Sequence, residues 1–149
     1  MKKLSILILD DEKRLREEIA EFLAKRNYVI FEAGLPSEAF DLIQLHEIDI
    51  AIVDIRLPEI SGLEVLQRIK KEHPSIEVLM ISGHGDMQTV IESMRLGAFD
   101  YFQKPFKLNE VNHAIQRTQR FIELNRQLEN SRKTVSVLSD KLYTSIGKP

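Results

Sequence analysis

Acidic, hydroxyl and basic side chains come directly after four apolar runs of this chain. Asp10 and Asp11 follow the run 4–9, Asp54 follows 48–53, Ser82 follows 76–81, and Lys104 comes two residues after 99–102. Clustered carboxylates repel one another unless a divalent cation neutralises them, and Mg²⁺ binds one or two carboxylates together with water and phosphate oxygens. Aspartate can also form an acyl phosphate. These residue types indicate magnesium-dependent phosphoryl chemistry, provided that the fold brings them together.

The roles divide naturally between these side chains. Asp10 and Asp11 would hold the metal, which leaves Asp54 to act both as a ligand and as the nucleophile. Phosphoryl transfer depends mainly on positioning and charge neutralisation, and Lys104 with the cation can neutralise the equatorial oxygens. The chemistry therefore needs no dedicated general base.

Five short apolar runs alternate with segments of helical periodicity. A further run at 28–31 joins the four above, and Glu32-Ala33-Gly34 after it adds no clear chemistry. The intervening helices are marked by apolar faces: Leu15, Ile19, Phe22 and Leu23 in the first; Ala39, Phe40, Leu42 and Ile43, after Pro36, in the second; Leu63, Leu66 and Ile69, expected to be buried, in the third; Val90, Ile91, Met94 and Leu96, before Gly97, in the fourth. Strands alternating with helices predict a doubly wound, five-stranded parallel α/β sheet covered on both faces.

Each candidate residue also has a simpler explanation. An acidic pair before a helix is often an N-cap with a first-turn charge, and Asp54 and Ser82 are common turn residues. A lysine before Pro105 is usually a solvated loop residue. However, the carboxyl ends of parallel strands lie at one edge of a sheet, where ligands bind. Matched groups from four separate loops at that edge favour a functional site.

The motifs resemble those of the receiver domain of two-component response regulators. The matching stretches are LDDE with Asp10 and Asp11, VDIRLPEISGLEVL with Asp54, Pro58 and Gly62, ISGHG with Ser82, and GAFDYFQKPF with Gly97, Ala98, Tyr101, Lys104 and Pro105. The resemblance covers about residues 3–120 and is greatest to receivers of the nitrogen-regulation type, which precede an ATPase and a DNA-binding domain in full-length proteins.

The resemblance implies a flavodoxin-like (βα)5 fold and specific roles. Asp54 would accept a phosphoryl group from a sensor histidine kinase, and Asp10, Asp11, Asp54 and the backbone carbonyl of Arg56 would bind Mg²⁺. It also implies Ser82 as the switch hydroxyl, Tyr101 as the switch aromatic, Lys104 as the phosphate-binding cation, a cis Lys104–Pro105 bond and an output face around the fourth helix and fifth strand. Serine replaces the commoner threonine at position 82, and Arg56 places a cation two residues after the acceptor; both bear on the lifetime of the phosphoryl group.

The last third of the chain differs in charge and pattern. Residues 1–105 hold 13 Lys/Arg and 19 Asp/Glu, whereas residues 106–149 hold 8 and 4, so the net charges are −6 and +4. An apolar heptad stripe follows position 120: Phe121, Leu124, Leu128, Val135, Leu138 and Leu142, with Ser131 in the same phase. We expect a receiver domain at 1–120 and a helical segment at 121–149 that forms a parallel coiled-coil homodimer. The basic residues flank this stripe and no DNA-binding motif follows, so direct binding to nucleic acid is not expected.

Composition excludes several other classes of protein. The chain has 149 residues, 43% hydrophobic and 30% charged, and no cysteine, which rules out disulfides and thiolate metal sites. No apolar run is long enough for a membrane span or a signal peptide, so a cytoplasmic location is expected. The four histidines are scattered, and only His84 is near the candidate chemistry.

Two other functions fit parts of the sequence. A small-molecule phosphatase or phosphotransferase would also use an aspartyl phosphate, but Asp10-Asp11 lacks the DxD spacing and no cap segment is inserted. An inert dimerisation module is disfavoured by the complete acidic and basic set. The expected function is a signalling switch rather than an enzyme, either complete or as the regulatory fragment of a transcriptional regulator.

Overall fold

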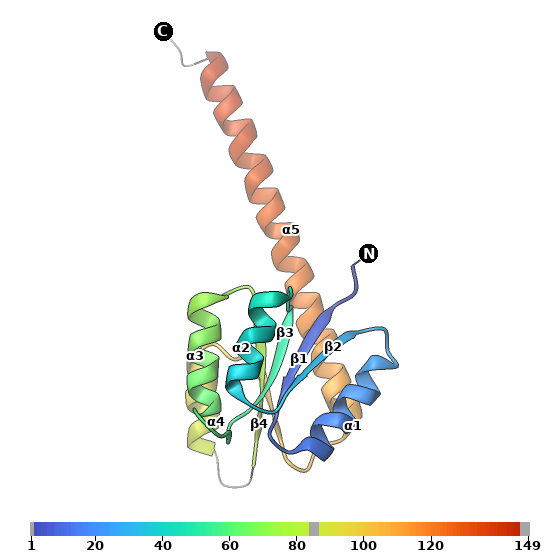
Figure 1. Cartoon of the computed structure of the whole chain (residues 1–149). Coiled ribbons are helices and arrows are strands. Elements are labelled where there is room, and N and C mark those ends of the chain that lie inside the picture. Colours follow the sequence, from blue (N-terminus) through green and yellow to red (C-terminus); the bar gives the residue numbers. More distant parts are fainter. Residues whose placement is uncertain (1, 84–86, 147–149) are drawn as a thin grey trace. The chain divides into compact units, whose positions relative to one another are not determined.

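The computed structural model describes residues 2–83 and 87–146. Within these residues, five strands form one parallel sheet in the order β2-β1-β3-β4-β5 (Figure 1). The strands are β1 (Ser5–Leu9), β2 (Val29–Ala33), β3 (Ile50–Asp54), β4 (Glu77–Ser82) and β5 (Asp100–Gln103). The helices are α1 (Lys13–Ala24), α2 (Pro36–Leu45), α3 (Gly62–Glu72), α4 (Met87–Arg95) and α5 (Leu108–Ile146). The predicted doubly wound α/β fold with a C-terminal helical extension is confirmed.

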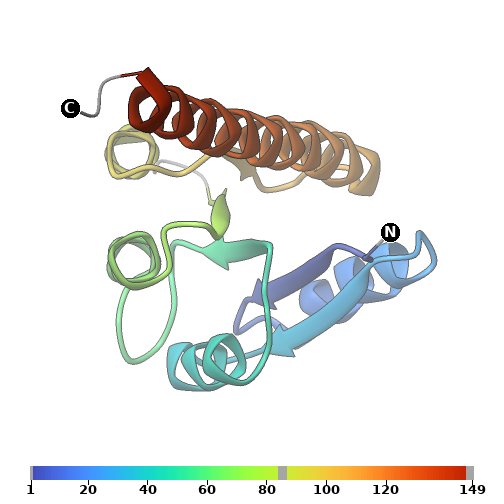
Figure 2. The same ribbon diagram turned by 90° about the horizontal axis from the view of Figure 1, so that it is seen from above.

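Alternate residues of the central strands pack on opposite faces of the sheet. One face contributes Leu7, Leu9, Ala51, Val53, Val78 and Met80 to a hydrophobic cluster with buried residues of α2, α3 and α4. The intervening residues Ile6, Ile8, Ile50, Ile52, Leu79 and Ile81 are also fully buried. They lie on the other face, where α1 and the first turns of α5 run (Figure 2). Burial on both faces explains why these strands read as almost continuous apolar runs.

Four strands end one or two residues later than the apolar runs predict. Asp54 and Ser82 are the last residues of β3 and β4 rather than the first residues after them. Backbone pairing continues past the apolar residues, because the Ile55 N–H donates to the Ile81 carbonyl at 2.9 Å and the Lys104 N–H to the Ser82 carbonyl at 2.8 Å. Both polar side chains are therefore held by the regular geometry of the sheet.

One helical face differs from the prediction, and a second carries exposed apolar residues. In α3 the expected burial of Leu63 is wrong, since Leu63 is only half-buried whereas Val65 is fully buried. Leu63 instead lines a surface cavity together with Thr89 of α4. In α4, Ile91 and Met94 are exposed. Only a narrow strip of each helix faces the sheet. Periodicity alone does not show which of two neighbouring apolar residues lies within that strip.

The chain divides into two compact units, Met1–Thr118 and Gln119–Pro149. The first contains the sheet, α1 to α4 and the start of α5. The described part of the second is the continuation of α5, where most side chains are exposed, including those of Leu124, Leu128 and Leu138.

Candidate functional site

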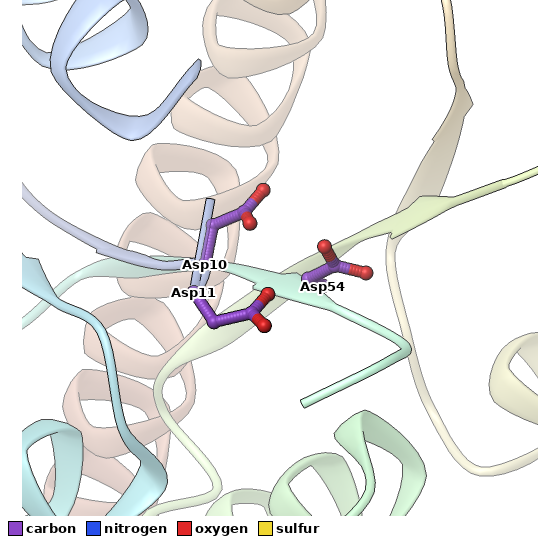
Figure 3. A group of neighbouring side chains, drawn as sticks. All are labelled: Asp10, Asp11 and Asp54. Carbon is purple, nitrogen blue, oxygen red and sulfur yellow. The ribbon is translucent and has the colours of Figure 1, made fainter. Parts of the chain in front are cut away.

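The three predicted carboxylates meet at the carboxyl ends of β1 and β3 (Figure 3). One carboxylate oxygen each from Asp10, Asp11 and Asp54 lies within 4.8 Å of the others. Asp10 is completely buried and Asp54 is 5% exposed, whereas Asp11 is exposed. The cluster therefore has a buried side and one side that solvent and ligands can reach.

Lys104 joins this cluster from the end of β5. Its Nζ donates to Asp54 Oδ2 at 3.0 Å and lies 3.7 Å from Asp10 Oδ2. Burial by itself lowers the pKa of Lys104, but the hydrogen bond to Asp54 and the charges of Asp10 and Asp54 outweigh it and raise the pKa above its ordinary value. The side chain therefore remains a cation beside the central carboxylate. The Lys104–Pro105 peptide bond is cis, as the resemblance implies.

Backbone amides fix the orientation of the two buried carboxylates. The Glu12 N–H donates to Asp10 Oδ1 at 2.9 Å, and the Arg56 N–H donates to Asp54 Oδ1 at 3.0 Å. In each case the amide belongs to the residue two positions further along the chain. The same short turn thus leaves the other oxygen, Oδ2, of each aspartate on the side of Lys104.

The negative charge of Asp10 is destabilised by burial. Burial raises its pKa from the ordinary value of 3.8 to about 6; the Glu12 amide opposes this rise and the charge of Asp54 adds to it. Its Oδ2 is buried and accepts no hydrogen bond from the described residues. A buried anionic oxygen without a donor is costly, and a hard divalent cation offers the missing compensation. The donor set therefore fits Mg²⁺.

The predicted switch residues lie outside this cluster. Ser82 is buried at the end of β4, and its Oγ donates to the Phe102 carbonyl of β5 at 3.3 Å. Tyr101, within β5, is 37% exposed. His84, which the sequence places near the chemistry, lies outside the described residues.

Glu12 is part of the site and is missed by the sequence-based assignment. Its Oε2 lies 3.4 Å from Lys104 Nζ, so this lysine faces three acidic residues. In the sequence Glu12 is a charged residue beside a predicted helix, and its residue type does not separate it from a solvated one. Its place directly after Asp10-Asp11 is the one available signal.

Gly62 allows the N-terminus of α3 to lie close to Asp54 and Ile55 at the end of β3. Its N–H donates to the Ile55 carbonyl at 2.8 Å, and a Cβ at this position would lie 2.1 Å from the Asp54 carbonyl oxygen and 2.7 Å from Ile55 Cα. These are backbone atoms, which cannot rotate away as a side chain can. The approach of the α3 N-terminus to the end of β3 therefore requires glycine.

The Gly62→Ala variant should lose about 3 kcal/mol or more of unfolding free energy, since a core overlap of this kind usually costs about 1–3 kcal/mol and here the neighbour is rigid. Urea denaturation followed by circular dichroism measures the loss. Ser61→Ala serves as the control, because it removes the N-cap bond to the Glu64 N–H and should cost about 1 kcal/mol. Equal stability of Gly62→Ala and the parent would contradict the close approach.

The parallel sheet and its flanking helices form a CheY-like receiver fold. A CheY-like receiver domain protein from Methanospirillum hungatei has the same fold, with a TM-score of 0.80 and 24% identity over 83% of this chain and 99% of that one. The family model for the response regulator receiver domain matches residues 6–116. The chain belongs to this family, whose members are phosphorylated on aspartate in two-component signalling, and the predicted resemblance is confirmed.

Several relatives are longer regulators. An NtrX-like response regulator of Rickettsia typhi is 36% identical over 129 residues, which are 85% of this chain and 27% of that protein. The crystal structure of NtrX from Brucella abortus has a TM-score of 0.84 and 32% identity over 89% of this chain and 30% of that one. A shorter relative, sporulation initiation phosphotransferase F of Bacillus subtilis, is 31% identical over 75% of this chain and 90% of its own. The chain thus spans less than a third of the NtrX-type proteins. Within the described residues, no helix is both long and apolar enough to cross a bilayer.

Proposed function

We propose that this chain is a phosphorylation-dependent switch in the cytoplasm, with a receiver domain at 1–120 that accepts a phosphoryl group on Asp54 from a sensor histidine kinase. One observation carries the assignment to Asp54. Its carboxylate is almost buried, accepts a hydrogen bond from Lys104 at 3.0 Å and lies within 4.8 Å of both other acidic side chains. Asp10 and Asp11 each lack this central place at the end of β3.

The residues of the site divide the work of the transfer. Asp10, Asp11, Asp54 and the Arg56 carbonyl would hold Mg²⁺, which when bound supplies positive charge for the phosphoryl oxygens. An Asp54 carboxylate oxygen forms the new bond to phosphorus while the bond from phosphorus to the kinase histidine nitrogen breaks, and the electron pair stays on that nitrogen. Lys104 gives a second positive charge beside the acceptor. The chain acts as a phosphoacceptor that promotes its own modification and not as an enzyme on a separate substrate.

The output of the switch is proposed to lie on the face formed by α4, β5 and α5. In response to the phosphoryl group, the Ser82 hydroxyl would move toward a phosphoryl oxygen and Tyr101 would turn inward. The exposed apolar side chains of Met87, Ile91 and Met94 support this face as a contact surface. The similarity to NtrX-type regulators supports a role as the regulatory part of a transcriptional regulator.

The metal requirement provides the direct test. The parent chain should gain one phosphoryl group from acetyl phosphate in Mg²⁺ and none in EDTA, as measured by intact-protein mass spectrometry. Asp11→Ala should weaken Mg²⁺ binding and slow labelling together, by about 10-fold or more, because it removes a ligand charge. Asp41→Ala, which removes an exposed carboxylate of α2, is the matched control and should behave like the parent. Labelling in EDTA at the parent's rate would refute the metal-dependent mechanism.

We also propose that the segment at 121–149 forms a parallel homodimer. Its support is the exposed heptad stripe, in which Leu124, Leu128, Leu138 and Leu142 are each more than half exposed in the single chain. A helix with such a stripe buries it by pairing. Parallel pairing along a two-fold axis would present two downstream effector domains side by side.

Truncation after Arg120 and the substitution Leu128→Asp should each convert the dimer to a monomer in analytical ultracentrifugation, while phosphorylation of Asp54 persists. Asn130→Asp makes the same change of charge at an exposed position away from the stripe and should leave the dimer intact. If the truncated chain and Leu128→Asp both sediment as dimers, the pairing surface lies elsewhere.

A further inference from the structure

Arg16 of α1 reaches back to the acidic end of β1, although it has no part in the chemistry proposed above. Its Nη1 donates to the backbone carbonyl of Asp10 at 2.7 Å, and its Nε donates to Glu32 Oε1 at 3.2 Å. The side chain is 15% exposed, far less than that of a typical surface arginine such as Arg14, which is 92% exposed. One guanidinium therefore links α1 to the ends of both β1 and β2.

Gly34 leaves room for the guanidinium in this position. A Cβ at residue 34 would lie 3.1 Å from Arg16 Nη1, which is closer than most such contacts, and 3.8 Å from its Cζ, which is an ordinary van der Waals distance. The chain thus provides a donor fork, a carboxylate that accepts from it and a glycine that leaves space for it. The guanidinium presents its Nη1 and Nε donors in a fixed planar fork, whereas an ammonium group donates from a single nitrogen.

The carbonyl that Arg16 binds belongs to the first residue after β1. Leu9 is the last residue of β1 that pairs with a neighbouring strand, so the Asp10 carbonyl lies just beyond the regular ladder. The Asp10 N–H donates to the Ala33 carbonyl at 3.1 Å. Since Asp10 is fully buried, its carbonyl would lose its donor away from water if Arg16 were removed. The peptide group between Asp10 and Asp11 sets the direction in which both carboxylates leave the backbone.

We propose that Arg16 is a positioning residue of the acidic cluster: it holds the Asp10–Asp11 peptide so that both carboxylates face Asp54, and it thereby sets the Mg²⁺ affinity of the site. The inference rests on the proposed metal-dependent function. Arg16 acts through Asp10 and Asp11 and contacts neither the metal nor the phosphoryl group. Outer partners of metal ligands commonly contribute 10–100-fold to metal affinity.

The structure offers a control with the same kind of contacts. Lys70 of α3 donates to the carbonyls of Pro74 and Ile76 and to Glu77 Oε1 at 3.0–3.2 Å, and its side chain is 22% exposed. These contacts lie at the amino end of β4, whereas the acidic cluster lies at the carboxyl ends of the strands. Lys70→Met therefore removes a half-buried cation, two carbonyl contacts and a glutamate contact without touching the site.

The experiment is a Mg²⁺ titration of the full chain followed by NMR amide shifts, for the parent, Arg16→Met, Arg16→Lys, Gly34→Ala and Lys70→Met. The dissociation constant should rise about 10-fold in Arg16→Met. It should rise less in Arg16→Lys, which keeps the positive charge but donates from a single nitrogen, and also in Gly34→Ala, which shifts the guanidinium slightly while every charge remains. Lys70→Met should stay within about 2-fold of the parent, since it alters none of the cluster's contacts.

A metal-free measurement complements the titration. In EDTA, hydrogen exchange of the Glu12 amide, which donates to Asp10 Oδ1, should be faster in Arg16→Met than in the parent and unchanged in Lys70→Met. If the parent binds Mg²⁺ and Arg16→Met binds it equally well, the positioning role is refuted. An equal loss in Lys70→Met also refutes it, because the effect would then follow overall stability. A parent that binds no Mg²⁺ would instead contradict the proposed function itself.

Discussion

The Asp54→Asn variant should take up no phosphoryl group from acetyl phosphate in Mg²⁺, where the parent chain takes up one. Asparagine has nearly the same size and can still accept the Arg56 N–H bond, but its amide oxygen is not a nucleophile comparable to a carboxylate. The loss should therefore be complete while the fold is retained. Intact-protein mass spectrometry and circular dichroism measure the two quantities on the same samples.

Controls separate the acceptor from acidic residues in general. Asp41→Asn makes the same chemical change at an exposed position of α2 and should label like the parent. Lys104→Met should slow labelling of Asp54 without moving it to another residue, because it removes the cation that lies 3.0 Å from the acceptor. Labelling of Asp54→Asn at the parent's rate would place the acceptor elsewhere.

The second large effect concerns stability in the absence of metal. Asp10→Asn should raise the unfolding free energy of the chain at pH 7 in EDTA by about 3 kcal/mol, since a rise of the pKa from 3.8 to about 6 corresponds to this amount of folding energy. The direction follows from burial, which penalises the charged form. An asparagine oxygen can still accept from the Glu12 N–H.

The same pKa predicts the pH dependence of stability. Between about pH 4 and pH 6 the unfolded chain has released the Asp10 proton while the folded chain still holds it. The contribution of Asp10 to the unfolding free energy therefore falls as the pH rises through this window and is lowest above about pH 6. Urea denaturation in EDTA at several pH values should show this fall in the parent and a smaller one in Asp10→Asn.

Magnesium should reverse the difference at neutral pH. Ligand binding to the folded state stabilises the parent in proportion to the logarithm of the metal concentration over its dissociation constant, whereas Asp10→Asn lacks a ligand charge. If Asp10→Asn were less stable than the parent in EDTA at pH 7, burial of the Asp10 charge would not be the cost inferred from the structure.

The fold and the central cluster follow from the sequence because both depend on strong local signals. Runs of β-branched residues mark buried parallel strands, and charge directly after such a run has few places to lie other than the carboxyl edge of the sheet. This reasoning brings Asp10, Asp11, Asp54 and Lys104 together. To place these residues at one edge, the reasoning needs the order of the strands but not the side-chain contacts.

Other features depend on tertiary contacts that a linear pattern does not contain. Arg16 and Arg14 look alike in sequence, yet one binds a buried carbonyl and the other is solvated. Leu63 and Val65 are both apolar residues at the start of α3, and their different burial depends on how the helix is rotated against the sheet. The last strand residues are set by hydrogen bonds between neighbouring strands and not by hydrophobicity.

The Ser82 hydroxyl has a single proton, which it donates to the carbonyl of Phe102 in the outermost strand. That proton cannot also be donated to a phosphoryl oxygen, so the two acceptors compete for it. Under the proposed mechanism, every phosphorylation event must break this hydrogen bond between β4 and β5. By thermodynamic reciprocity, any partner that binds better while this hydrogen bond is intact would make phosphorylation of Asp54 less favourable at equilibrium, and any partner that binds better once it is broken would make phosphorylation more favourable.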